Sequence, residues 1–181
     1  MKLSKWLLAL VLLLPGQLAA QRPDLVVFIA VDQLRGDYLD RFGPGLTGGL
    51  ARLKNQGAHF VNAYQDHAVT VTAVGHASML SGRFPRSHGI ISNNLGVPDP
   101  QARSIEGGAS ASPFRFRGSV LIDWMRVADA QSRALSVSVK DRGAILPLGR
   151  AKQQAFWYSG TGSFTTSNYY ADTLPDWVKR F

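Results

Sequence analysis

The chain has 181 residues, no cysteine and a formal net charge of +8 at neutral pH. Without cysteine it can form no disulfide and carry no cysteine-linked lipid, so an exported form would depend on its apolar core or on bound metal. The basic residues are scattered, with no run of five, which does not favour nucleic-acid binding and leaves a positive potential that suits small anionic substrates.

The first 20 residues have the pattern of a cleavable export signal. Lys2 and Lys5 precede an apolar run over residues 6–14, which is too short to span a bilayer as a stable helix. Pro15-Gly16 breaks this run, and Ala19-Ala20 offers a small-residue cleavage site. We therefore predict a signal peptide over 1–20, a mature chain over 21–181 without a membrane anchor, and a periplasmic or secreted location.

Residues 25–31 predict a central strand. They are seven consecutive apolar residues rich in Val and Ile, as expected for a strand covered on both faces. Asp32 stands at the carboxyl end of this strand, where ligands bind in open α/β sheets. It is thus either a metal ligand or an ordinary loop or capping aspartate.

The next elements lead to a candidate nucleophile. Leu46, Leu50 and Leu53 predict an amphipathic helix that ends at Gly57, and residues 58–64 predict a second strand. Residues 69–82 then change from alternating Val and Thr to a helical pattern that stops at Gly82. A hydroxyl at such a helix start lies well for attack on a phosphoryl group, although most threonines there only cap the helix.

The remaining elements complete an α/β pattern. Residues 83–94 predict a structured loop and residues 95–118, which are rich in Gly and Pro, a long surface excursion. Beyond them we expect a helix over 120–130, strands over 134–139 and 155–158, a loop over 159–167 and the start of a helix at 168. Strands alternating with helices predict an α/β fold with a largely parallel sheet flanked by helices.

Four short motifs resemble the alkaline phosphatase superfamily. The resemblance is to its type I phosphodiesterase/nucleotide pyrophosphatase branch, and above all to PafA-like alkaline phosphatases, and it covers residues 24–181. The motifs are Val31-Asp32-Gln33, Thr72-x-x-Gly75-His76, Pro85-x-x-His88-Gly89-Ile90-Ile91-x-Asn93 and Lys140-Asp141-Arg142-Gly143-Ala144-Ile145-Leu146-Pro147.

This resemblance implies a two-zinc phosphohydrolase that works through a phosphothreonine intermediate. Asp32 would be a metal ligand, and Thr72 would be the nucleophile and touch the same metal. Asn93 would bind a phosphoryl oxygen, and Lys140 and Arg142 match the Lys-x-Arg pair of the monoesterase members. Thr70 is a rival nucleophile on local grounds, but the family's nucleophile lies four residues before the histidine that matches His76.

The chemistry agrees with these implied roles. A threonine hydroxyl is almost un-ionised at neutral pH, so a zinc ion is needed to activate it. Phosphoryl transfer needs donors around the equatorial oxygens. If Lys140 and Arg142 lie on one strand they point the same way, and two cations favour a monoester, which carries one more negative charge than a diester.

The four histidines show no metal-ligand spacing. We expect His76 to be a buried hydrogen-bonding residue, with support of the site as the alternative, and His88 to be structural. His59 and His67 have no evident partners in the sequence. None is therefore predicted to bind zinc.

The further zinc ligands of the family are missing from this chain. After Arg142 the only acidic residues are Asp172 and Asp176, and no histidine follows. We therefore expect an N-terminal fragment of a catalytic domain, incomplete on its C-terminal side and inactive alone, whose parent hydrolyses small phosphate monoesters. The alternatives are a phosphodiesterase or nucleotide pyrophosphatase, and a truncated non-catalytic phosphate-binding protein.

Overall fold

The computed structural model describes residues 23–181, so the predicted signal peptide lies outside the described residues. The described residues fall into two units, 23–31 and 32–181. In the first unit, residues 25–31 form no strand, and their large apolar side chains are exposed. The predicted central strand is therefore wrong for this structure, because a strand is held by a ladder to neighbours and no described residue pairs with this segment.

The second unit begins with small helices. These are α2 (Tyr38–Arg41), the 3-10 helix η1 (Gly43–Gly45) and α3 (Gly48–Gln56), which ends at Gly57 as predicted. Residues 58–64 contain a turn and no strand, and Phe60, Val61 and Tyr64 are exposed. The strand predicted there is also wrong, since loose alternation alone provides no pairing partner.

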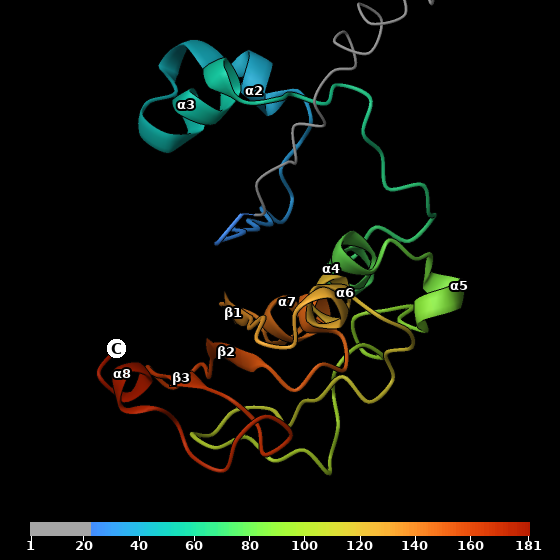
Figure 1. Ribbon diagram of the computed structural model, residues 1–181, viewed down its shortest axis with the longest axis vertical. Coiled ribbons are helices and arrows are strands. Elements are labelled where there is room, and N and C mark those ends of the chain that lie inside the picture. Colours follow the sequence, from blue (N-terminus) through green and yellow to red (C-terminus); the bar gives the residue numbers. More distant parts are fainter. Residues whose placement is uncertain (1–22) are drawn as a thin grey trace, which may run out of the picture. The chain divides into compact units, whose positions relative to one another are not determined.

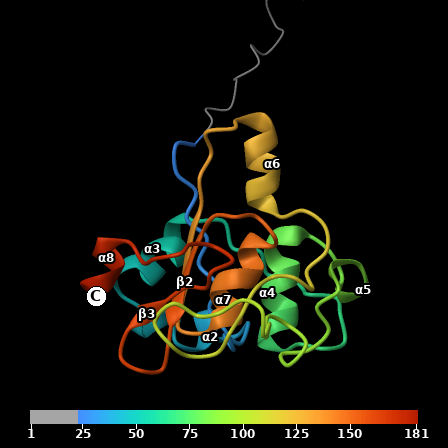
Figure 2. The ribbon, with the colours of Figure 1, turned by 90° about the horizontal axis from the view of Figure 1, so that it is seen from below.

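Helix α4 (Thr72–Ser81) is the central helix of the second unit. Its small residues Ala73 and Ala77 are fully buried, and Gly82 ends the helix in the left-handed conformation that suits the stop predicted there. The predicted loop over 83–94 contains a short helix, α5 (Pro85–His88). Helix α7 (Asp141–Ile145) packs on α4 and continues into the 3-10 helix η2 (Leu146–Leu148), and Figures 1 and 2 show α4 and α7 side by side.

The sheet has three strands in the order β1-β2-β3. β1 (Leu135–Ser138) and β2 (Gln154–Tyr158) were predicted and pair in parallel, with α7 in the crossover between them. β3 (Phe164–Thr165) lies inside the predicted loop over 159–167 and pairs antiparallel with β2. The sheet is therefore mixed, with its longer ladder parallel as predicted, because a short connection returns a strand only in the antiparallel direction.

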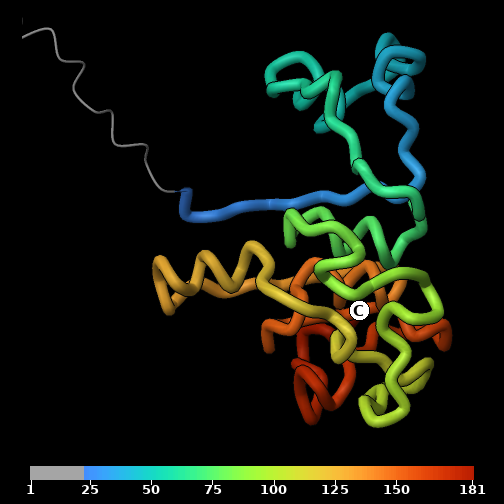
Figure 3. The backbone as a smooth tube through the Cα atoms, turned by 90° about the vertical axis from the view of Figure 1, so that its right-hand side faces the viewer, coloured from blue at the N-terminus to red at the C-terminus, as the bar shows by residue number. Residues whose placement is uncertain are grey.

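Residues 95–118 pack into the core, contrary to the predicted surface excursion. Val97, Ala111 and Phe116 are buried with residues of α4, α7 and β2. The segment pairs with itself through the Pro98–Ala111 bridge, and Ile105 N donates to Thr166 O at 2.9 Å. These bonds pair part of its backbone without helix or strand. Figure 3 traces the segment in yellow-green beside the orange and red C-terminal chain.

Helix α6 (Leu121–Ala128) forms within the predicted range 120–130. Trp124 and Val127 are 61% and 81% exposed, whereas Ile122 is buried. Helix α8 (Asp176–Lys179) is much shorter than the helix expected from residue 168. No helix within residues 23–181 is long and apolar enough to cross a membrane.

Candidate active site

Thr72 is the first residue of α4, and its hydroxyl faces a carboxylate from a distant part of the chain. Val71 precedes it in an extended conformation, as its β-branched side chain favours. Thr72 Oγ1 donates to Asp32 Oδ2 at 3.1 Å. Thr70 stands before the helix and, in the described chain, does not share this bond. In the described chain, Thr72 rather than Thr70 therefore contacts Asp32.

Asp32 accepts hydrogen bonds from two predicted site residues. Besides Thr72, Lys140 Nζ donates to the same oxygen, Oδ2, at 3.0 Å. The Lys140 ammonium, helped by the Thr72 hydroxyl, holds the pKa of the Asp32 carboxyl below its ordinary value of 3.8, although partial burial opposes this. Asp32 is therefore anionic at neutral pH and a weak base, which suits it to orient Thr72 or bind a cation rather than remove a proton.

Asn93 lies at the same helix start. Its Oδ1 accepts a hydrogen bond from Ala73 N at 2.9 Å, which satisfies one of the unpaired N–H groups in the first turn of α4. The side-chain cap therefore comes from Asn93 and not from a threonine, so the capping role considered for Thr72 is not what places it there. The Asn93 amide nitrogen keeps its two hydrogens for another acceptor.

Lys140 and Arg142 do not lie on one strand, which corrects that expectation. Lys140 is the residue before α7, and Arg142 is within the helix, so the shared face of a strand does not describe their positions. The Arg142 guanidinium reaches Asp141 at 3.3 Å, and its Nε is buried without a hydrogen-bond partner in the described chain. Lys140 therefore contacts Asp32, which also binds Thr72. Arg142, two positions along the chain, does not contact this group, and its Nε donor has no partner in the described chain.

The buried histidines are hydrogen-bonded within the fold. His76 Nδ1 donates to Thr72 O at 2.8 Å, which ties the ring to the residue that begins the helix. His88 Nδ1 accepts from Ile90 N at 3.1 Å, and its Nε2 lies 3.0 Å from Ser78 Oγ. Burial lowers the pKa of His88 to about 4. His88 is thus structural, as expected from the sequence.

A zinc ion would find only a partial set of ligands here. Asp32 and Thr72 offer two neighbouring oxygens, and the described residues contain no group of three Asp, Glu, His or Cys that could hold a metal. A zinc site takes about four ligands, of which about three come from protein in catalytic sites. The residues present therefore do not make a zinc centre by themselves.

The Asp32–Lys140 pair could not be foreseen from local sequence. The two residues are separated by 108 positions, and nothing in either local pattern signals their contact. Only the presence of both motifs in one family hinted that they would meet.

Comparison with known proteins places the chain in a family. Residues 26–180 match the family model described as "Type I phosphodiesterase / nucleotide pyrophosphatase". The chain belongs to this family. Its curated relatives include alkaline phosphatase PafA of Elizabethkingia meningoseptica, 38% identical over 98% of this chain and 37% of PafA. Alkaline phosphatase PhoV of Synechococcus elongatus is 39% identical over 88% of this chain and 32% of PhoV.

Solved structures of a family member share the fold. The wild-type PafA crystal structure matches with a TM-score of 0.77 at 35% identity, over 82% of this chain and 32% of that one. A PafA mutant with a threonine changed to serine, and an asparagine, a lysine and an arginine changed to alanine, matches with a TM-score of 0.76 at 34% identity, over 83% of this chain and 32% of that one. The chain thus has an alkaline-phosphatase-like α/β fold and spans about a third of the length of these relatives.

Proposed function

We propose that this chain carries the nucleophile-bearing part of an exported, zinc-dependent phosphohydrolase that cleaves phosphate monoesters through a phosphothreonine intermediate. The observation that carries the proposal is the contact of Thr72, Asp32 and Lys140 at the start of α4. A hydroxyl, an anionic carboxylate and an ammonium meet there. The side-chain amide of Asn93 lies beside them, because it accepts a hydrogen bond from the backbone N–H of Ala73.

Each side chain has a distinct task in the proposed reaction. Thr72 Oγ1 attacks phosphorus as its proton passes to solvent, an Oγ1–P bond forms, and the bond from phosphorus to the leaving oxygen breaks, so that the leaving group takes up a proton from solvent and departs as an alcohol. Water then attacks phosphorus, the Oγ1–P bond breaks, Thr72 recovers a proton and phosphate is released. Asp32 orients the Thr72 hydroxyl, while Lys140 and the Asn93 amide donate to phosphoryl oxygens as charge moves onto them.

Two reasons lead us to include zinc: the resemblance to the family, and the oxygen atoms of Asp32 and Thr72, which can bind the ion. Bound zinc supplies positive charge that lowers the pKa of a coordinated hydroxyl. The two oxygens leave about two ligands to be supplied from outside the described residues.

The residue types changed in the PafA mutant support the proposed roles. That mutant replaces one threonine, one asparagine, one lysine and one arginine. Its threonine and asparagine are as far apart in sequence as Thr72 and Asn93 are here, and its lysine and arginine are two positions apart, like Lys140 and Arg142. The correspondence favours Thr72 over Thr70 as the nucleophile.

A phosphodiesterase or nucleotide pyrophosphatase is the second candidate, because the matching family model carries that description. The cations favour the monoesterase. Lys140 and the unused Nε donor of Arg142 would neutralise the second charge of a monoester, which a diester lacks.

The test is a chimera in which residues 23–181 replace the matching region of PafA. We expect Thr72→Ala to lower hydrolysis of a chromogenic phosphate monoester by roughly three orders of magnitude or more, as loss of a nucleophile does. Thr70→Ala is the matched control and should change the rate far less. Mass spectrometry after acid quench should find the phosphoryl group on Thr72, and finding it on Thr70, or a reversed order of the two variants, would contradict the proposal.

A further inference from the structure

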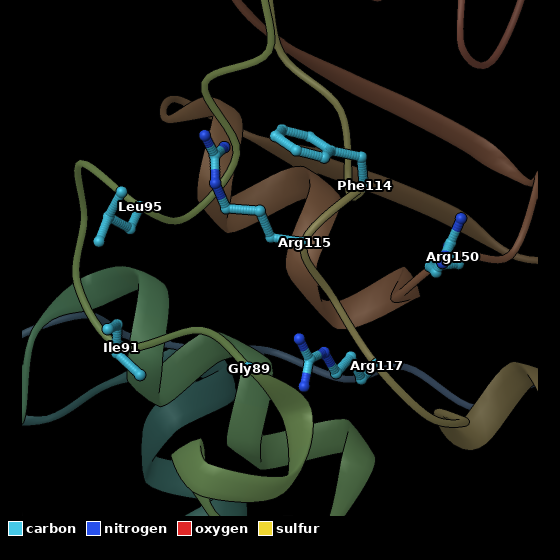
Figure 4. Close-up of a pocket in the computed structure, with 7 residues that line it drawn as sticks. All are labelled: Gly89, Ile91, Leu95, Phe114, Arg115, Arg117 and Arg150. Carbon is cyan, nitrogen blue, oxygen red and sulfur yellow. The ribbon is translucent and has the colours of Figure 1, made fainter.

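A second cleft is built from residues that the candidate active site does not use. It has a volume of about 410 Å³, within the range of ligand pockets in proteins. Figure 4 shows the residues that line it, which are Gly89, Ile91, Leu95, Phe114, Arg115, Arg117 and Arg150. None of the residues assigned to phosphoryl transfer lines it.

The charged side chains of the cleft are all of one sign. Three arginines line it, and no carboxylate does. Arg115 donates to Pro98 O and lies over the Phe114 ring, with 4.0 Å between the guanidinium carbon and the ring centroid. Within residues 23–181 the guanidinium groups of Arg117 and Arg150 form no ion pair or hydrogen bond. Like charges without a counterion repel, and an anion in the cleft would relieve this.

The backbone that carries these arginines is fixed to the core. Arg117 N donates to His88 O at 2.9 Å, and His88 is fully buried and stacked on Phe116. Tyr169 donates from its hydroxyl to Arg150 O at 2.8 Å. The backbone positions of Arg117 and Arg150 are thus set before any ligand arrives, which lowers the entropic cost of binding.

Gly89 keeps the wall of the cleft open. It adopts a positive φ of 79°, and a Cβ there would lie 3.0 Å from Arg115 O and 3.5 Å from Arg117 Cδ. A side chain would therefore press on the segment that carries two of the arginines. Only glycine gives both the backbone conformation and the space.

The uncharged side chains of the cleft are apolar. Ile91, Leu95 and Phe114 are each exposed to about half of their area, so they present carbon surface to a ligand. Arginine forks bind phosphate oxygens in pairs, and an aromatic ring of a ligand would pack on such an apolar surface. We propose that this cleft is a second binding site, for a small organic phosphate whose dianionic group meets Arg117 and Arg150 and whose aromatic or apolar group contacts Phe114.

Phenylphosphonate is a suitable probe because it is a stable dianion at pH 8.5 and resists hydrolysis. It is titrated into the whole chain by calorimetry at low salt. We expect the double variant Arg117→Gln/Arg150→Gln to bind it at least tenfold more weakly. The variant Phe114→Ala should weaken the binding of phenylphosphonate more than the binding of methylphosphonate, which lacks the ring. All three substituted side chains are exposed, so each variant should keep the wild-type circular dichroism spectrum.

Two control variants distinguish binding in this cleft from general charge attraction and from binding at the candidate active site. Arg52→Gln/Arg86→Gln removes the same charge from exposed positions outside the cleft and should bind like wild type. Lys140→Gln alters the candidate active site and should keep the binding that the cleft variant loses. The proposal is overturned if wild type binds no phenylphosphonate, if the charge-matched control loses as much affinity as the cleft variant, or if only Lys140→Gln loses binding.

Discussion

The buried His88 predicts a loss of stability in mild acid. Its Nδ1 accepts from Ile90 N, and its side chain is fully buried, so a proton on Nδ1 would break a hydrogen bond and place a charge in the core. Burial, with a smaller contribution from the charge of His67, lowers the pKa of His88 from 6.5 to about 4. Between these values the unfolded chain binds a proton that the folded chain does not, so the free energy of unfolding falls as pH falls.

The size of this effect follows from the two pKa values. At about 1.4 kcal/mol per pKa unit, the difference amounts to about 3 kcal/mol between pH 7 and pH 4. Well above pH 6.5, His88 is neutral in both the folded and the unfolded chain, so none of this free energy of unfolding is lost. Asp32 adds little over most of this window, because its pKa is lowered from 3.8, and an ordinary carboxyl takes up protons only towards the acid end of the window.

Urea unfolding at pH 7, 5.5 and 4 measures this loss. His88→Gln keeps an amide near the ring position and cannot titrate, so it should be less stable at pH 7 but lose about 3 kcal/mol less than wild type on going to pH 4. His59→Gln removes an exposed histidine and should keep the wild-type pH dependence. Parallel stability curves for wild type and His88→Gln would refute the reasoning.

The site and the fold predict four further outcomes. In the PafA chimera, Arg142→Ala should lower kcat/KM for a monoester by 10- to 1000-fold, about 1.4–4 kcal/mol, and for a diester by less; equal losses would argue against a monoesterase. The chain alone should bind zinc weakly in equilibrium dialysis and hydrolyse no monoester above background; two tight zinc ions with turnover would disprove this. Gly149→Ala should lower the free energy of unfolding in urea by about 1–3 kcal/mol, because a Cβ there would lie 2.8 Å from Val120 Cγ1 and 2.9 Å from Phe116 Cε1. The control Gly49→Ala, where a Cβ would meet open space, should not destabilise the chain. Expressed with its first residues, the chain should start near Gln21 on N-terminal sequencing of exported material; a chain starting at Met1 would speak against a signal peptide.

Local pattern was enough for elements that are defined by their own residues. The helix that ends at Gly57, the helix within residues 69–82 that stops at Gly82 and the two parallel strands were all predicted. Their periodicity, stop signals and β-branched content lie within a few residues of each other. Strands predicted at 25–31 and 58–64 failed because a strand also needs a partner, which its own sequence does not specify.

Burial was harder to predict than helicity. The sequence predicts the helix α6, but it does not say that Trp124 lies outside while Ile122 lies inside. The Gly- and Pro-rich segment over 95–118 looked like a surface loop, yet Phe116 is fully buried. In both places the outcome depends on contacts with distant residues, and composition carries no information about them.

In the candidate site too, local pattern predicted some residues, whereas contacts between distant residues could not be predicted. Asp32 and Thr72 were singled out by their positions at element ends, and the resemblance preferred Thr72 to Thr70. That Lys140 would reach Asp32 from the start of a helix, while Arg142 turns to Asp141, depends on where α7 packs. Backbone geometry of this kind is set by the fold and not by a motif.

The packing of residues 95–118 against β3 has a consequence for the order of folding. Ser104 and Glu106 both bond to the Thr165 hydroxyl at 2.9 Å, across 61 and 59 positions of sequence. Contacts of such long range must close a large loop before they contribute, so they form late and slow folding. During synthesis the buried residues Val97 and Phe116 emerge well before Thr165, and until then they expose apolar surface that a chaperone would have to cover.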